Sequence, residues 1–201
     1  MIRGCAKFIS GVFSPFLIPS YIYVTLIFSS YLAILPINSI LIIIGVIAFF
    51  TAIVPFISIA WNNYHIGQNL NKSASYPFLI TGICYMFLAY ILLKSGVPIW
   101  IVSFTFSGIV LLMMLAVLKK SFNISIHMTG FGAYMGAVFT IVRFQGAIIP
   151  LEIIALIILL GGFLGSARAY LKNYTPGGII TGMILGFVWC YYMAFFTRIL
   201  F

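Results

Sequence analysis

Three polar side chains, His127, Arg168 and Tyr174, stand beside or within apolar segments of this chain. His127 lies about one turn into one apolar segment, Arg168 closes the next, and Tyr174 directly precedes the last. A histidine exchanges protons near neutral pH. An arginine beside the free N–H groups of a helix N-terminus is suited to hold phosphate oxygens. The pattern therefore predicts anion binding or acid–base chemistry where three helix ends meet.

The chain around these residues is too hydrophobic for a water-soluble domain. Of its 201 residues, 64% are hydrophobic and only 5% are charged, against about 45–50% and about 25% in an ordinary soluble domain. Too few polar side chains are present to cover a surface that faces water. We therefore expect an integral membrane protein.

The charged residues exclude several classes of function. Glu152 is the only acidic side chain, so sites that need two carboxylates, such as carboxylate magnesium clusters and paired proton relays, are excluded. The net charge is +9, but the basic residues stand singly or in pairs rather than in a cluster that tracks nucleic acid. Three widely spaced cysteines form no disulfide or zinc pattern. We expect no metal, no cofactor and no nucleic-acid partner.

Seven apolar blocks approach the roughly 20 residues that a helix needs to cross about 30 Å of hydrocarbon. They predict an all-α, polytopic membrane bundle of about seven transmembrane helices, with residues 1–201 as a single domain. Two helices in residues 1–61 are expected to form a lipid-facing flank, and residues 77–201 a five-helix core that carries the site. The expected spans are Pro15–Leu35, 37–61 with a kink at Pro55, Pro77–Leu93, Val97–Leu118, Ile124–Val142, Ala147–Ser166 and Pro176–Thr197.

The basic residues also predict the orientation. The N-terminal segment with Arg3 and Lys7 is followed by a long apolar run without a cleavage pattern, so we expect it to be retained. We call the side that carries the N-terminus side A. The positive-inside rule places side A in the cytoplasm. The side-A bases are Arg3, Lys7, Lys72, Lys119, Lys120, Arg168 and Lys172, and the side-B bases are Lys94, Arg143 and Arg198.

Small residues predict which helices pack closely, because lipid provides no hydrophobic drive for helix association. Gly178, Gly182 and Gly186 recur every four residues and form a strip along one face of the last span. The two spans before it carry the pairs Gly132 with Gly136 and Gly161 with Gly165. We expect these three spans to form one compact unit.

The motifs around the polar residues resemble the second and third motifs of the type 2 phosphatidic acid phosphatase family. The matching segments are Ser-Ile-His-Met-Thr-Gly at 125–130, Gly-Ser-Ala-Arg at 165–168 and Tyr-Thr-Pro-Gly-Gly at 174–178. The chain is most similar to the short bacterial members. The resemblance implies a helical protein of the bacterial inner membrane that acts on lipid phosphates, such as phosphatidate or an isoprenyl phosphate, without a metal.

The resemblance also implies roles for individual residues. His127 corresponds to the general acid, and Tyr174 stands at the position of the nucleophilic histidine. Gly178 stands where the family has a supporting aspartate. A tyrosine hydroxyl without a neighbouring base is a poor nucleophile at neutral pH. The residues that would bind phosphate are Arg168, Lys172, Lys120, Lys72 and Ser125.

Three functions remain open from the sequence. The first is binding of a lipid or isoprenoid phosphate with lost or altered catalysis, with membrane lipids and a protein as partners. The second is a working metal-independent lipid phosphatase with a shifted nucleophile, such as His127. The third is a small transporter or assembly factor in which His127 and Arg168 are structural.

Overall fold

The computed structural model describes residues 2–58, 60, 76–121, 123–144, 149–171 and 174–200. Every regular element in these ranges is helical and no strand occurs in them, which confirms the all-α class. The elements are α1 (Ile2–Val12), α2 (Ile18–Phe28), the 3₁₀ turn η1 (Tyr31–Ile34), α3 (Ile37–Ala48), the π-helical turn η2 (Phe49–Ile53), α5 (Tyr76–Lys94), α6 (Ile99–Ser121), α7 (Ile126–Phe144), α8 (Leu151–Tyr170) and α9 (Pro176–Leu200).

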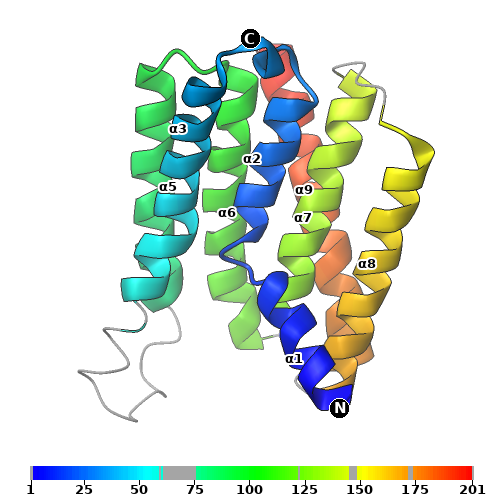
Figure 1. Ribbon diagram of the computed structural model, residues 1–201. Coiled ribbons are helices and arrows are strands. Elements are labelled where there is room, and N and C mark those ends of the chain that lie inside the picture. Colours follow the sequence, from blue (N-terminus) through cyan, green and yellow to red (C-terminus); the bar gives the residue numbers. More distant parts are fainter. Residues whose placement is uncertain are drawn as a thin grey trace.

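The helices stand side by side, and from α2 onward successive helices run in opposite directions (Figure 1). The N-terminus and α1 lie at the lower end of the view, and α9 ends at the upper end. The start of α7, the end of α8 and the start of α9 also lie at the lower end, which is side A. The residues with candidate chemistry therefore occupy the same end of the bundle as α1.

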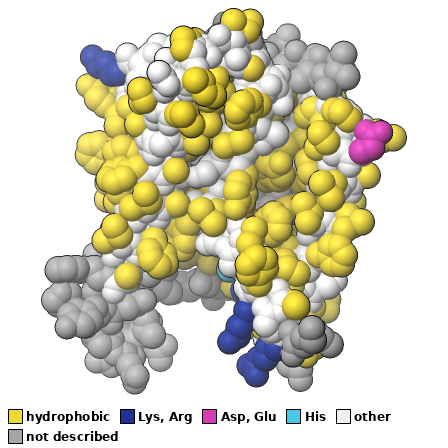
Figure 2. All heavy atoms as spheres, in the orientation of Figure 1, with side chains coloured by type: hydrophobic (Ala, Val, Ile, Leu, Met, Phe, Trp, Pro, Cys, Tyr) yellow, Lys and Arg dark blue, Asp and Glu magenta, His cyan; other side chains and the backbone are white. Residues whose placement is uncertain are grey.

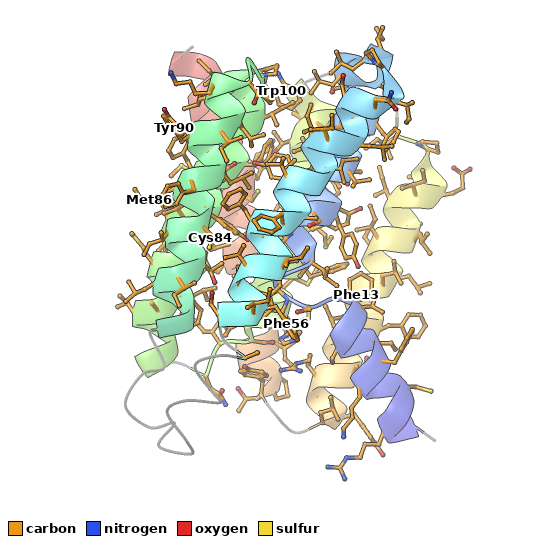
Figure 3. The ribbon with its side chains drawn as sticks, turned by 60° about the vertical axis from the view of Figure 1, so that its left-hand side comes forward. Phe13, Phe56, Cys84, Met86, Tyr90 and Trp100 are labelled. Atoms are coloured by element: carbon orange, nitrogen blue, oxygen red, sulfur yellow. The ribbon has the colours of Figure 1, made fainter. Side chains whose placement is uncertain are left out.

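In the part of the chain that the structure describes, four helices are long and apolar enough to cross a membrane, which supports an integral membrane protein. Large hydrophobic side chains cover the described surface (Figure 2). Met86 and Tyr90, for example, are 58% and 60% exposed and point away from the bundle (Figure 3). Such a surface is suited to hydrocarbon. The four helices are Ile37–Ser58, Ile99–Leu118, Leu151–Tyr170 and Pro176–Met193, and shorter apolar helices cover Ile18–Phe28 and Phe78–Lys94.

The closest helix pair is α7 with α9, and glycines allow the approach. A Cβ on Gly186 would overlap the backbone carbonyl oxygen of Thr129, and one on Gly136 would lie 2.6 Å from the carbonyl oxygen of Phe187. Only glycine lets two helix backbones come this near. The expected glycine contact is confirmed for these two helices.

Helix α8 packs differently from this expectation. A Cβ on Gly161 would meet the ring of Phe131 at 2.7 Å, and one on Gly165 would meet side chains only, those of Met128 and Ile179. The backbone of α8 thus stays farther from α7 than that of α9, and α8 packs mainly against α1. The expected compact unit is confirmed for α7 and α9, whereas α8 contacts both helices less closely, because side chains fill the space in front of its glycines.

Helix α2 also differs from its predicted position as a lipid-facing flank. Leu26 is fully buried, and Tyr23 is 3% exposed, with its hydroxyl hydrogen-bonded to that of Thr105 on α6. Helix α2 packs against α3 and the central helix α7. Of the two helices expected to form the lipid-facing flank, only α3 has exposed apolar side chains along its length, for instance Leu41 and Ile42. The Ile, Leu and Phe content did not distinguish lipid contact from core contact.

The kink expected at Pro55 takes the form of a π-helical turn. Val54 donates its N–H to the carbonyl of Phe49, five residues earlier, and residues 54–58 then continue as helix. Proline has no N–H, and its ring crowds the carbonyl four residues before it. The wider turn η2 lies where Pro55 would otherwise disturb the regular α-helical hydrogen bonds.

Helix α1 is separate from the first expected span. It is amphipathic, with Ala6 and Ser10 buried and Arg3, Lys7 and Phe8 exposed. An 11-residue helix is too short to cross a bilayer. Its position beside α8 at the side-A end is that of a helix at the membrane surface.

Candidate functional site

His127 is the second residue of α7 and is partly exposed. Its Nδ1 atom is buried and has no hydrogen-bond partner among the described residues. Buried polar atoms in proteins are nearly always hydrogen-bonded. An unpartnered ring nitrogen at a helix start is therefore available to a ligand.

Arg168 lies in the last turn of α8 and is only 8% exposed. Its Nε atom is buried without a hydrogen-bond partner in the described part of the chain. The guanidinium carbon lies 5.2 Å from the centre of the Tyr174 ring, within the range of a cation–π contact. The contact joins the end of α8 to the residue that precedes α9.

The structure brings Arg168 and Tyr174 into contact. His127 begins α7 at the same end of the bundle, where α8 ends and α9 starts. One buried cation, Arg168, thus lies at the end of α8, where α7 and α9 begin. We call these three residues the cation site.

The start of α9 offers fewer free donors than the sequence suggested. Thr175 precedes the helix, and its Oγ1 accepts the N–H of Gly178 at 3.2 Å. Pro176 in the first turn has no N–H to offer. The N-terminus of α9 is therefore largely satisfied by its own cap, and the cation site depends on its side chains.

Gly178, which stands where the resembled family has an aspartate, has no room for a side chain. A Cβ there would overlap the carbonyl oxygen of Asn123. The carbonyl of Gly178 accepts the N–H of Ser125 at 3.1 Å, which ties the start of α7 to the start of α9. Glycine at this position is explained by helix contact.

Ser125 is fully buried at this junction, and its Oγ has no partner among the described residues. Its backbone carbonyl accepts the hydroxyl of Thr129 at 3.0 Å. Ser125 thus belongs to the backbone contact between α7 and α9. It is separate from the contact between Arg168 and Tyr174.

The lysines expected to bind phosphate remain untested. Lys120 is in the last turn of α6, but its side chain lies outside the described part of the structure. Lys72 and Lys172 lie outside the described residues altogether. Glu152 lies in the first turn of α8, at the opposite end of that helix from Arg168.

The structure adds Ser10, which the sequence analysis did not select. Ser10 is 8% exposed on the buried face of α1, and its Oγ has no partner in the described ranges. It lines a pocket together with His127. The spacing of Ala6 and Ser10, four residues apart and so on one face of a helix, is the signal that could have indicated its position.

Comparisons with known proteins give no further guide to this site. No protein-family model, curated protein or solved structure matches the chain. The chemistry of the site is therefore interpreted from its own geometry.

Proposed function

We propose that this membrane protein binds the phosphate group of a lipid, such as phosphatidate or an isoprenyl phosphate, at the cation site. The observation that carries the proposal is the buried, positively charged Arg168 without a protein anion. The Nε atom of Arg168 has no partner among the described residues. A ligand that brings negative charge and hydrogen-bond acceptors would satisfy it.

The sequence makes a protein counterion unavailable to this arginine. Glu152 is the only acidic side chain in the chain. It lies 16 positions before Arg168 on the same helix, which corresponds to about 24 Å at about 1.5 Å per residue. A charge held in a membrane protein without a partner is costly. An external anion removes that cost.

The neighbours of Arg168 favour phosphate as that anion. Arginine forms paired hydrogen bonds with phosphate oxygens. The ring of Tyr174 lies against the guanidinium, and a stacked ring holds its plane in one orientation. The imidazole of His127 supplies a further polar group on the neighbouring helix. A tetrahedral oxyanion suits donors that approach from two helices.

Binding is better supported than hydrolysis. The family that the motifs resemble uses a histidine nucleophile, and Tyr174 occupies that position in this chain. Its ring contacts Arg168, an arrangement that stabilises a phosphate site and does not require attack by the hydroxyl. We therefore propose lost or altered catalysis within a core like that of the phosphatidic acid phosphatases.

The proposed topology has seven membrane crossings. Helices α2, α5 and α7 add to the four long apolar helices. Helix α7 is mostly buried among the others, so it needs less apolar surface of its own. The basic residues of α1, Arg3 and Lys7, favour a cytoplasmic side-A end under the positive-inside rule. The resemblance to the short bacterial phosphatases favours a bacterial inner membrane.

Lipid binding by purified protein in nanodiscs tests the proposal. Phosphatidate, an isoprenyl phosphate and inorganic phosphate are offered to the native protein, to Arg168→Gln and to Arg143→Gln. Arg143 is an exposed arginine in the last turn of α7, at the other end of the bundle. We expect Arg168→Gln to lower lipid phosphate affinity about 10- to 100-fold, since hydrogen bonds to charged groups contribute about 1.5–3 kcal/mol.

The control variant and the product assay decide between outcomes. Arg143→Gln is expected to bind as the native protein does. An equal loss of lipid phosphate affinity in both arginine variants would show that the effect comes from net charge alone. That result would overturn the proposal. Phosphate release that depends on His127 would establish the hydrolase instead.

A further inference from the structure

A groove runs into the side-A end of the bundle between α1 and the helical segment that continues α3. Its volume is about 570 Å³, within the range of about 300–1,000 Å³ typical of ligand pockets. Ser10 and Gly11 of α1 line one side, Ala52 and Phe56 line the other, and His127 lies in the wall between them. We call this space the chain groove.

The walls of the chain groove are apolar apart from a few side chains. Phe16, Leu17, Ile53 and Ile57 complete much of its lining. Figure 3 shows Phe56 at the lower end of the segment after α3 and Phe13 just above α1. The ring of Phe13 packs edge-on against Phe131 of α7, with centroids 5.5 Å apart. Aromatic packing therefore fixes the link between α1 and α2 beside the groove.

The π-helical turn η2 is also fixed in place. Thr51 in this turn is fully buried and shares a hydrogen bond of 3.1 Å with the hydroxyl of Ser20 on α2. Ala52 and Ile53 follow it in the chain and face the groove. Turns of this type often occur at functional sites. The groove is built from elements that packing and hydrogen bonds hold.

His127 connects the groove to the cation site. It lines the groove, and it begins α7 at the side-A end of the bundle, where α8 ends with Arg168. A molecule that lies in the groove and reaches past His127 thus has an apolar part between α1 and the α3 segment and a polar end near a buried guanidinium. A lipid phosphate has these same two parts, an apolar chain and a charged head group.

We infer that the hydrocarbon chain of the bound lipid lies in the chain groove, so that the protein selects long-chain lipid phosphates over free phosphate and short-chain phosphate esters. This inference rests on the proposed function, and it adds the part of the ligand that the groove recognises. Apolar walls exclude a purely ionic ligand as the occupant. The buried, unpartnered Oγ of Ser10 provides one acceptor or donor for an ester or hydroxyl oxygen on the way to the phosphate.

Two glycines of α1 allow a matched test. A Cβ on Gly11, which lines the groove, would meet no atom within 4 Å, so a larger side chain enters open space there. A Cβ on Gly4 also meets no atom within 4 Å, but Gly4 does not line the groove. Gly11→Phe therefore places a large side chain at the wall of the groove, and Gly4→Phe makes the same change elsewhere on the same helix.

Binding of dioleoyl phosphatidate and of dibutyryl phosphatidate is measured for the native protein, Gly11→Phe, Gly4→Phe and Arg168→Gln. We expect Gly11→Phe to weaken dioleoyl phosphatidate at least about 10-fold and to leave the short-chain analogue unchanged. Gly4→Phe is expected to change neither. Arg168→Gln is expected to weaken both. A phosphatidate with a photoreactive group in its chain should label residues 10–17 and 52–57.

The outcomes separate the groove from the cation site. Unchanged dioleoyl binding in Gly11→Phe, with loss in Arg168→Gln, overturns the chain groove and leaves the proposed function standing. Equal loss for both lipids in Gly11→Phe, or equal loss in Gly4→Phe, also overturns the groove. No loss in Arg168→Gln overturns the proposed function itself. Photolabelling confined to other helices contradicts the groove independently of any variant.

Discussion

The contact between α7 and α9 and the side-A end of the bundle satisfy their polar groups in opposite ways. Along α7 the hydroxyls of Thr129 and Thr140 bond to carbonyls four residues earlier, at 3.0 Å and 2.8 Å. Trp189 of α9 donates to the carbonyl of Ser107 on α6 at 3.1 Å. The middle of the bundle thus pairs its polar groups internally.

The side-A end leaves polar atoms unpaired. Buried side-chain atoms without a partner among the described residues occur in Ser10, Ser125, His127 and Arg168. His127 begins α7 and Arg168 ends α8 on side A, Ser125 directly precedes α7, and Ser10 lines the chain groove together with His127. Bilayers penalise unpaired polar groups strongly. The α7–α9 contact is therefore a scaffold that satisfies its own polar groups. The side-A end needs a ligand to satisfy its polar groups.

The largest expected effect is on the scaffold, in Gly186→Ala. The new Cβ would overlap the carbonyl oxygen of Thr129, and backbone atoms cannot rotate away as side chains do. We expect the free energy of unfolding to fall by about 3 kcal/mol, the upper part of the usual range for overpacking. Thermal unfolding in detergent measures it.

Gly162→Ala is the matched control for that variant. A Cβ on Gly162 of α8 meets no atom within 4 Å, so the alanine should raise stability by up to about 1 kcal/mol through helix propensity. Similar destabilisation by both variants would show that the α7–α9 contact does not depend on glycine.

The scaffold was the part of the fold that the sequence predicted best. Gly178, Gly182 and Gly186 are spaced four residues apart, and residues with that spacing lie on one face of a helix. The gap between the expected spans Pro77–Leu93 and Val97–Leu118 is a turn, in which Gly96 has a φ of +72°. Val97 then donates to the carbonyl of Leu92, as in a Schellman motif. Residue type therefore predicts local backbone geometry.

The side-A end was predicted only in part. The order of His127, Arg168 and Tyr174 along the chain indicated three helix ends on one side of the bundle, and Arg168 and Tyr174 are in contact there. Helix α1 and the chain groove were not predicted, because their positions depend on how α1 folds back on α8. The burial of α2 was missed for a similar reason, since apolar residues suit lipid and protein contacts equally.

A smaller effect is expected at the cation site, in Tyr174→Leu. Loss of the ring removes the cation–π contact with Arg168, worth about 0.5–2 kcal/mol. Affinity for lipid phosphate should therefore fall about 2- to 30-fold. Tyr174→Phe keeps the ring and should retain affinity within about twofold. If Tyr174→Phe binds as weakly as Tyr174→Leu, the hydroxyl rather than the ring carries the effect.

The next effect concerns stability without ligand, in Ser10→Ala. A buried, unpartnered hydroxyl costs about 1–3 kcal/mol, so its removal should stabilise the ligand-free protein by about 1 kcal/mol. Ser166→Ala is the control, because Ser166 is exposed and its hydroxyl bonds to the carbonyl of Gly162. It should shift stability by less than about 0.5 kcal/mol. Destabilisation by Ser10→Ala would show that the hydroxyl has an internal role and that the side-A end is less open than the comparison implies.

The smallest expected effect is in Thr175→Val, at the junction of scaffold and site. The substitution removes the Oγ1 that accepts the N–H of Gly178, and an N-cap loss costs about 0.5–1 kcal/mol at an exposed helix end. Amide hydrogen exchange should quicken in the first turn of α9, while Thr181→Val, which removes a hydroxyl bonded to the Gly177 carbonyl, leaves it unchanged. Because the freed N–H of Gly178 would become available to an anion, lipid phosphate affinity should stay level or rise slightly as stability falls. A joint fall in stability and affinity would instead mean that the cap positions Tyr174, and that scaffold and site are less separate than their hydrogen bonds indicate.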